Sequence, residues 1–154
     1  ELKFGPFSIT DPEKPDLAIP LDITEFEKPV VKVDLNGENP KIHVKLKFEG
    51  DIVSIQSGID YETPEKLPIV EDAFEKQLIK GIKDTFDKCK EMKADVFDFG
   101  TTAASQFWTI PEWEEYNWLE KFSESELEVE VDFTVRRTGK LIKSEPNFSS
   151  EGKE

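Results

Sequence analysis

Two stretches of the chain alternate strictly between apolar and polar residues. A period of two places successive side chains on opposite faces of a strand, so each stretch is predicted to be a strand with one buried and one solvated face. The apolar positions are Ile42, Val44, Leu46 and Phe48 in the first stretch, and Leu127, Val129, Val131, Phe133 and Val135 in the second.

Asn36-Gly37 precedes the first of these strands and separates two runs rich in β-branched residues. This dipeptide is typical of a tight hairpin turn, so a further strand is predicted before it. Beyond Gly50 the apolar positions shift by one residue. A β-bulge at Gly50 or a tight turn would cause this shift, and we favour a bent strand that continues past Gly50.

The polar faces of the two alternating strands carry opposite charges. One has Lys41, Lys45 and Lys47, and the other has Glu126, Glu128, Glu130 and Asp132. Four acids on one strand face repel each other unless cations lie opposite. The two strands are therefore predicted to be antiparallel neighbours, with lysines facing carboxylates on the solvent side and the aliphatic rows on the helix side.

A long amphipathic helix is predicted between these strands. Thr63-Pro64-Glu65 combines a capping hydroxyl with proline in the first turn, which is typical of a helix start. Pro68 is expected to kink or restart the helix. Apolar residues then recur every three to four positions as far as Lys93, and they are Val70, Phe74, Leu78, Ile82, Phe86 and Cys89.

Two shorter helices are predicted next. Asp95 is placed to cap a helix that runs toward Phe107. Thr109 and Glu112 have the spacing of a capping box, which predicts a third helix as far as Phe122.

These elements combine into a single α+β domain over residues 1–142, with an antiparallel sheet of three to five strands and about three helices packed mainly on one face. Residues 1–28 are rich in proline, which cannot donate to a sheet ladder, and are predicted to be an irregular lead-in rather than a central strand. Within it, residues 17–19 and 21–23 are candidates for short edge strands. Residues 143–154 are polar and are predicted to be a disordered tail.

The net charge of −14, from 34 acidic and 20 basic residues, narrows the classes of partner. A field of this sign repels phosphate backbones and anionic lipid headgroups, so neither a nucleic acid nor membrane binding through a basic patch is expected. The single cysteine, Cys89, excludes an internal disulfide. Its place on the apolar helix face predicts a buried thiol rather than a nucleophile.

Asp98-Phe99-Gly100 matches the DFG motif, whose aspartate binds magnesium in protein kinases. A kinase also needs a glycine-rich loop, a strand lysine and a catalytic histidine motif, and the single histidine here is His43, in a predicted strand. The three residues are therefore interpreted as part of a helix whose glycine allows close packing.

No metal site, cofactor or catalytic residue is predicted. Residues 34–39 only partly fit a calcium loop, and a hairpin turn explains them better. His43 has neither a second histidine nor paired cysteines with which to bind zinc. A glycosidase-type pair of carboxylates leaves no sequence signature, so a hydrolytic alternative stays open.

Aromatic residues gather within fifteen positions near the end of the predicted helical region. They either cap the core or, in part, anchor a partner, because Trp and Tyr are favoured at binding hot spots. The candidates for a partner surface are Trp108, Trp113, Tyr116 and Trp118.

Four segments in order carry a family resemblance: KIHVKLKFEGDIVSIQSG with the long helix after it, KADVFDFG, EYNWLEKF and ELEVEVDFTVRRTG. Over Pro29 to Thr138 the chain resembles the C-terminal part of the germinant-receptor C subunit, the Ger(x)C family of endospore-forming bacteria. It departs at Asp98, where the family often has glycine, and at Pro68, in a helix usually free of proline. The family-matched positions are Asp95, Phe97, Gly100, Asn117, Trp118, Arg136, Arg137 and Gly139.

The resemblance implies structural roles first for these positions, with Asp95 as a helix cap and Arg136 and Arg137 paired with nearby acids. It also implies a lipoprotein held on the outer face of the spore inner membrane, assembled with integral-membrane A and B subunits that respond to nutrients. The family's lipidated cysteine lies near its N-terminus and is absent from this chain; Cys89 does not match it. The fragment itself is expected to be soluble.

The resulting hypothesis is an extracellular, non-enzymatic interaction domain that nutrient-triggered germination requires. Its partners would be the A and B subunits or other spore inner-membrane proteins. The alternative is a small-molecule or glycan binding or hydrolytic domain, which needs a concave pocket with convergent polar groups. A third hypothesis is a spacer that holds other domains away from the membrane.

Overall fold

The structure is a computed structural model that describes residues 3–136, apart from the side chains of Lys3, Phe4 and Glu25. Within this range four strands form one sheet in the order β1-β2-β3-β4: β1 (Lys3–Thr10), β2 (Ala18–Asp34), β3 (Lys41–Ile52) and β4 (Glu126–Val135). The helices in this range are α1 (Leu67–Glu91), α2 (Phe99–Ala104), α3 (Ile110–Tyr116) and α4 (Trp118–Ser123). The predicted α+β class is confirmed. The tail predicted for residues 143–154 lies outside the described residues.

The sheet is mixed, because β3 and β4 run parallel while the other neighbours run antiparallel. The prediction that β3 and β4 are neighbours is right, and their register sets Lys45 beside Glu130. The predicted antiparallel direction is wrong. All four helices lie in the connection between these strands, and a crossover of this length returns the chain to the same end of the sheet. The charge pattern could not reveal the strand direction, because the lysines of β3 would face the carboxylates of β4 in a parallel pair and in an antiparallel pair alike.

The first 28 residues are not the irregular lead-in that their prolines predicted. They form β1 and much of β2, which pair antiparallel. Two of the prolines lie where a ladder donor is not required: Pro6 is in the edge strand β1, and Pro29 follows Thr24, the last β2 residue paired with β1.

Gly50 lies in regular register between Ile23 of β2 and Val135 of β4, so the predicted bulge at this glycine is wrong. A Cβ atom there would lie 2.8 Å from Ile23 Cδ1 and 2.9 Å from the carbonyl oxygen of Asp22. Glycine is needed for this close approach. The predicted continuation of the strand past Gly50 is confirmed, and β3 ends at Ile52. The register shifts of the β2–β3 pair lie within residues 25–30 of β2.

The helix boundaries differ from the predicted ones in three places. Helix α1 begins at Leu67 instead of near Thr63, which places Pro68 in the first turn, where its missing N–H is tolerated. Helix α2 begins at Phe99, four residues after Asp95. The predicted third helix is divided into α3 and α4 by Asn117, whose φ of 51° is left-handed.

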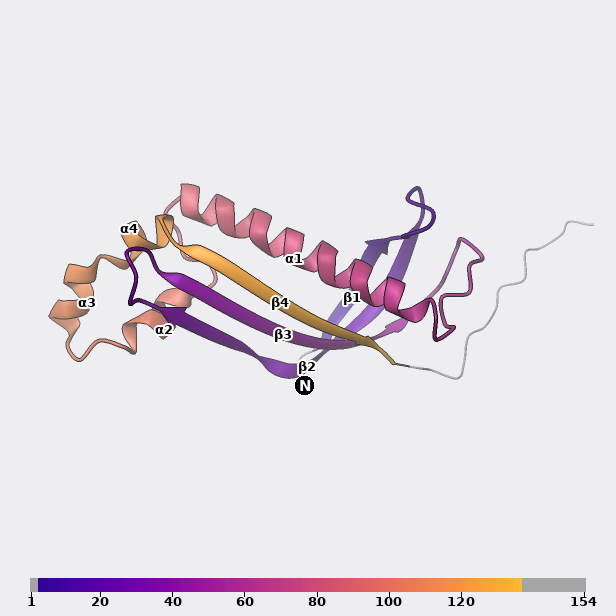
Figure 1. Cartoon of the computed structure of the whole chain (residues 1–154), viewed down its shortest axis with the longest axis horizontal. Helices are drawn as coiled ribbons and strands as arrows, with labels where there is room; N and C mark the ends of the chain where they lie inside the picture. Colours follow the sequence, from indigo (N-terminus) through magenta and orange to yellow (C-terminus); the bar gives the residue numbers. More distant parts are fainter. Residues whose placement is uncertain (1–2, 137–154) are drawn as a thin grey trace, which may run out of the picture.

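Helix α1 runs along the sheet and buries its apolar side chains against it (Figure 1). In one cluster, the rings of Phe74 and Phe133 lie 4.1 Å apart. In the other, Phe86 packs edge-on to Phe122 of α4 with ring centroids 5.3 Å apart. Cys89 belongs to this second cluster and is buried, as predicted. Burying each of these rings contributes roughly 2–3 kcal/mol.

Side chains from α1 and from the turn after α2 close parts of the sheet edges. The backbone N–H groups of Phe133 and Val135 in β4 donate to carboxylates of α1, to Glu75 at 2.9 Å and Glu71 at 3.0 Å. In β2, the Val33 carbonyl accepts from Gln106 at 2.7 Å. Open strand edges invite pairing with other chains, and these contacts block that pairing locally.

Candidate partner-binding site

A single carboxylate, that of Asp95, ties together the helices at one end of the molecule. Its Oδ1 accepts from the backbone N–H of Phe99 at 3.1 Å. Its Oδ2 accepts from the N–H of Gly100 at 2.6 Å and from the indole Nε1 of Trp118 at 2.9 Å. Asp95 therefore satisfies two N–H groups in the first turn of α2, although the N-cap residue itself is Asp98, and it also holds α4 beside α2. We call Asp95, Gly100 and Trp118 the Asp95 knot.

Gly100 leaves no room for a side chain. A Cβ atom would lie 2.8 Å from Trp118 Nε1 and 3.2 Å from Asp95 Oδ2. The close packing expected from this glycine is present. The neighbouring Asp98 has a φ of 59° at the helix boundary and accepts a hydrogen bond from Thr101 Oγ1 at 2.7 Å. A left-handed backbone favours glycine, and short polar residues such as Asp also adopt it.

The other family-matched positions also have structural roles where the structure describes them. Phe97 is half-buried and stacks on Phe99 with ring centroids 5.3 Å apart. Asn117 supplies the left-handed turn between α3 and α4. Arg136 pairs with Asp51 at 2.6 Å. Arg137 and Gly139 lie outside the described residues.

The four aromatic candidates for a partner surface separate by burial. Trp118 is 7% exposed and belongs to the core. Trp113 and Tyr116 are half-buried and stack with ring centroids 6.2 Å apart. Trp108 is 96% exposed. The structure therefore leaves Trp108 as the member of this set whose ring is free for a partner.

Trp108 occupies a position that normally packs on a helix. Thr109 caps α3 in a capping box with Glu112, as predicted. The residue before such a cap usually packs on the fourth helical residue, here Trp113, as a hydrophobic staple. Phe107 contacts Trp113 instead, at 5.3 Å between ring centroids, and leaves Trp108 in solvent.

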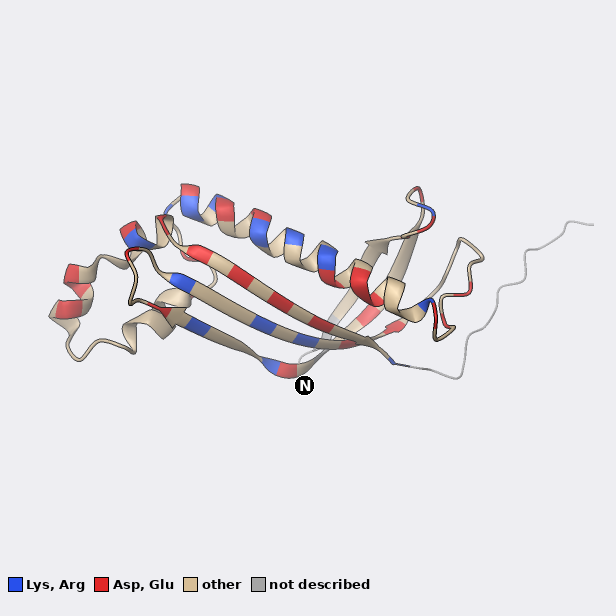
Figure 2. Ribbon diagram, viewed as in Figure 1, with Lys and Arg blue, Asp and Glu red and all other residues tan. Residues whose placement is uncertain are grey.

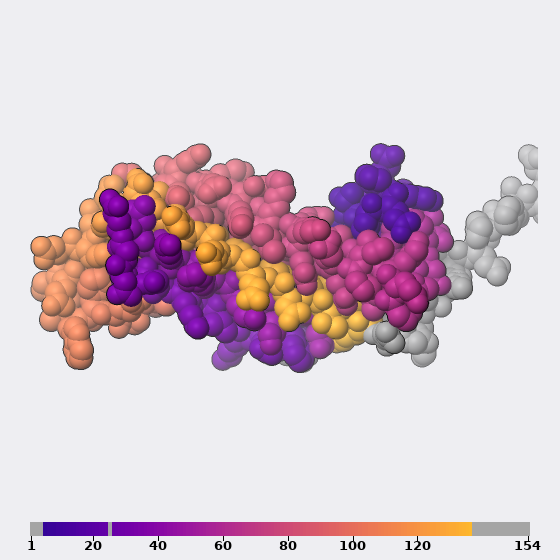
Figure 3. All heavy atoms as spheres, viewed as in Figure 1, coloured from indigo at the N-terminus to yellow at the C-terminus, as the bar shows by residue number. Residues whose placement is uncertain are grey.

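Ile110 lies on the other side of Thr109 and is 74% exposed. We call Trp108 and Ile110 the apolar tip. The sequence reading missed Ile110, although the capping box could have identified it as a first-turn residue without a core neighbour. The segment around α3 forms one end of the elongated molecule (Figure 3).

Basic positions alternate along β3 and acidic positions along β4 (Figure 2). Their side chains form ion pairs on the open face of the sheet. Lys45 lies 3.1 Å from Glu130 and His43 lies 2.9 Å from Glu128, as the register requires. Lys47 instead pairs with Glu27 at 2.8 Å, and this hydrogen bond raises the pKa of Lys47. A hollow of about 620 Å³ crosses this face. Its paired charges are exposed, and exposed pairs contribute little to stability.

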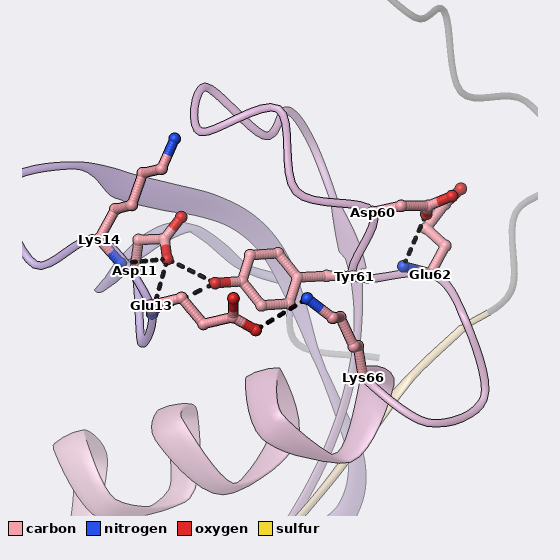
Figure 4. Close-up of polar contacts among 7 residues, drawn as sticks. All are labelled: Asp11, Glu13, Lys14, Asp60, Tyr61, Glu62 and Lys66. Carbon is pink, nitrogen blue, oxygen red and sulfur yellow. Dashed lines mark hydrogen bonds and ion pairs between the residues drawn. The ribbon is translucent and has the colours of Figure 1, made fainter.

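A buried polar cluster lies around Tyr61 (Figure 4). Tyr61 Oη donates to Asp11 Oδ1 at 2.5 Å, and the same oxygen accepts from the N–H groups of Glu13 and Lys14, each at 3.0 Å. Burial, with the bond to Asp11, raises the pKa of Tyr61 to about 12. Burial acts to raise the pKa of Asp11, but hydrogen bonds from Tyr61 and these N–H groups outweigh it and lower that pKa.

This cluster is a structural latch rather than an accessible site. Asp11 and Tyr61 are at most 1% exposed, and they join the β1–β2 connection to the segment before α1. Lys66 and Glu13 close the same junction with an ion pair at 2.9 Å.

Residues 3–136 contain neither a metal-binding group nor a membrane-spanning helix. No group of three or more His, Cys, Asp and Glu side chains in this range is placed to hold a metal ion. No helix in this range combines the length and apolar character that crossing a membrane requires.

Comparison with known proteins identifies relatives in spore germination. The family described as spore germination B3/GerAC-like, C-terminal, matches residues 1–139. Spore germination protein KC of Bacillus subtilis (strain 168) is 32% identical over 126 residues, which are 79% of this chain and 30% of that protein. The chain thus spans less than a third of the length of this curated relative.

A solved structure shares the fold. The crystal structure of the GerBC protein superposes with a TM-score of 0.65 at 23% identity, covering 86% of this chain and 40% of that chain. The family match also includes the first 28 residues, where the resemblance in sequence motifs is weaker. The chain therefore belongs to the spore germination B3/GerAC-like C-terminal family, that of the germinant-receptor C subunits.

Proposed function

We propose that this chain is a non-enzymatic interaction domain of a spore germinant-receptor C subunit. In the full-length protein it would be extracellular, held by a lipid anchor on the outer face of the spore inner membrane. There it would dock with the integral-membrane A and B subunits, and nutrient-triggered germination would depend on that contact. Family membership supports the setting.

One observation carries the interaction role, namely the 96% exposure of Trp108. Transferring a large aromatic side chain from water to an apolar environment is favourable, and Trp is enriched at binding hot spots. The neighbouring rings of Phe107, Trp113 and Tyr116 pack together without Trp108. Because the fold does not use this ring, a partner is the simplest use for it.

The polar clusters support a non-enzymatic role. The carboxylates facing Lys45 and His43 are in ion pairs on an exposed surface. The carboxylate of Asp11 is buried, and its Oδ1 accepts from three of the protein's own donors. Neither arrangement offers a polar group in a closed cleft, which the hydrolytic alternative needs.

The test is the substitution Trp108→Ala in the full-length protein, produced in spores at the wild-type level. A hot-spot tryptophan contributes about 2 kcal/mol, so the contact should weaken roughly 30-fold. Co-purification with the A and B subunits and the germination rate after nutrient addition should both fall.

The matched control is Phe26→Ala, since Phe26 is also an exposed aromatic residue, at 59%. Its substitution should leave both measurements unchanged. Normal assembly and germination with Trp108→Ala would contradict the proposal and favour a spacer role.

A further inference from the structure

Large exposed apolar side chains are concentrated at the helical end of the domain. Within residues 92–119 they are Met92, Val96, Trp108, Ile110 and Leu119. Of these, Trp108 and Ile110 are the most exposed and flank one residue, Thr109. The apolar tip is thus a pair of side chains presented together.

The tip is held rigidly in the free domain. The Thr109 hydroxyl accepts from the N–H of Glu112, and the Glu112 carboxylate accepts from the N–H of Thr109. Phe107 contacts both Trp113 and Tyr116, at 5.3 and 5.1 Å between ring centroids. A pre-organised backbone loses little entropy on binding, which favours a docking role for the side chains that it carries.

The surface around the tip is acidic. Residues 107–124 contain five glutamates and one lysine. Glu114 and Glu115 are exposed, and within residues 3–136 their carboxylates have no ion-pair or hydrogen-bond partner. Figure 2 shows α3 with acidic positions and no basic ones. The tip therefore projects from a patch of uncompensated negative charge.

The negative charge around the apolar tip indicates which kind of partner binds it. An anionic lipid surface would be repelled by the glutamates, although it accepts tryptophan at its interface. A protein surface with Lys or Arg beside an apolar pocket would attract the glutamates and bury the tip. We propose that the apolar tip inserts into an apolar pocket bordered by Lys or Arg side chains on a partner protein. The proposal rests on the interaction role and adds the chemistry of the partner.

The experiment places a photo-crosslinking phenylalanine analogue at Ile110 of the full-length protein in its native membrane, and maps the crosslinked residues by mass spectrometry. We expect crosslinks to apolar residues that have Lys or Arg neighbours on the same partner surface. The double substitution Glu114→Lys/Glu115→Lys should lower the crosslink yield at least about fivefold, because like charges then face each other. Raising the salt concentration should lower the yield of the unsubstituted protein.

The control is Glu62→Lys/Glu65→Lys, which makes the same change in charge at two exposed positions before α1. It should leave the yield unchanged. Thermal unfolding should show that both double variants are folded, because all four glutamates are exposed.

The outcomes separate the two proposals. Crosslinks to a protein site without nearby cations, or a yield that both double variants leave unchanged, would overturn the basic-bordered pocket and leave the interaction role standing. Crosslinks to lipid, with binding of the purified domain to phosphatidylglycerol vesicles, would overturn the basic-bordered pocket in favour of a membrane contact. Absence of any crosslink together with normal germination of Trp108→Ala would overturn both.

Discussion

At the scale of single residues, the helical end depends on positions where the backbone or a neighbour leaves little choice of side chain. Lys93, Asp98 and Asn117 each have a positive φ, between 49° and 59°. They lie at helix boundaries, where a left-handed residue changes the direction of the chain. Gly100 is constrained differently, by the indole of Trp118.

The substitutions Gly100→Ala and Gly81→Ala should therefore act in opposite directions. At Gly100 the added methyl overlaps the buried Trp118 and should lower the free energy of unfolding by about 1–3 kcal/mol. At Gly81, inside α1, a Cβ meets no atom within 4 Å, and the higher helix propensity of alanine should raise it by about 0.5–1 kcal/mol. Urea unfolding measures both changes, and a loss at Gly81 equal to that at Gly100 would refute the steric argument.

At the scale of secondary-structure elements, α1 has a second role besides covering the sheet. Its carboxylates at Glu71 and Glu75 accept from two outward N–H groups of β4, those of Val135 and Phe133. A buried donor that loses its acceptor costs about 1–3 kcal/mol, so these contacts stabilise the edge strand as well as protect it from other chains.

The substitution Glu75→Ala should lower the free energy of unfolding by about 1–2 kcal/mol, because the Phe133 N–H loses its acceptor. Glu75→Gln keeps an acceptor oxygen and should retain most of the stability. The control is Asp72→Ala, which removes the exposed pair with Lys76 and should cost less than about 0.5 kcal/mol. Hydrogen exchange at the Phe133 amide should accelerate with Glu75→Ala; equal losses for Glu75→Ala and Asp72→Ala would contradict the edge role.

At the scale of the whole molecule, the two ends of the elongated domain are stabilised by different means. The helical end is fastened by the Asp95 knot and stacked aromatic rings. The end that contains β1 is fastened by the buried latch of Tyr61 and Asp11 (Figures 1 and 4). The latch contains an ionisable pair, so it makes the stability of the domain depend on pH.

The folded domain holds the phenol proton of Tyr61 more tightly than the unfolded chain does, since its pKa rises from 10.0 to about 12. This contribution to stability is fully present below pH 10 and is lost as the pH rises through about 12. Tyr61→Phe should lower the free energy of unfolding by about 1–2 kcal/mol at pH 7, through the lost hydrogen bond to Asp11.

The difference in stability between wild type and Tyr61→Phe should shrink between pH 10 and pH 12, because only the wild type loses the contribution of Tyr61. Lysine titration changes the stability of both proteins equally, so its effect cancels in the difference between them. Denaturant unfolding at a series of pH values measures the difference, and a constant difference over this range would show that the phenol is not held by the latch.

Much of the fold was predictable from local patterns. Alternation placed Ile42 and Val131 on the helix side of their strands, and complementary charges made Lys45 and Glu130 neighbours. Thr109 and Glu112 form the capping box that their spacing indicated. These features depend on residues close in sequence or on a pattern repeated along a strand, so they can be recognised from the sequence alone.

The candidate site was predictable only in part. The sequence located the aromatic group but could not separate exposed Trp108 from buried Trp118. Exposure depends on which rings pack against Trp113 in the folded chain, and these include Phe107 and Trp118. It matched Asp95, Gly100 and Trp118 individually without showing that one carboxylate joins them. Contacts between residues more than twenty positions apart leave no local pattern.

The sequence by itself determined the α+β class, the buried face of each alternating strand, the hairpin at Asn36-Gly37 and the charge pairing across the open sheet face. Only the tertiary structure decided that β4 runs parallel to β3, that β1 and β2 use the proline-rich segment, and that Trp108 remains in solvent. The physical reason is that side-chain period and charge are properties of neighbouring residues. Strand direction, edge position and burial depend instead on how distant segments share one core.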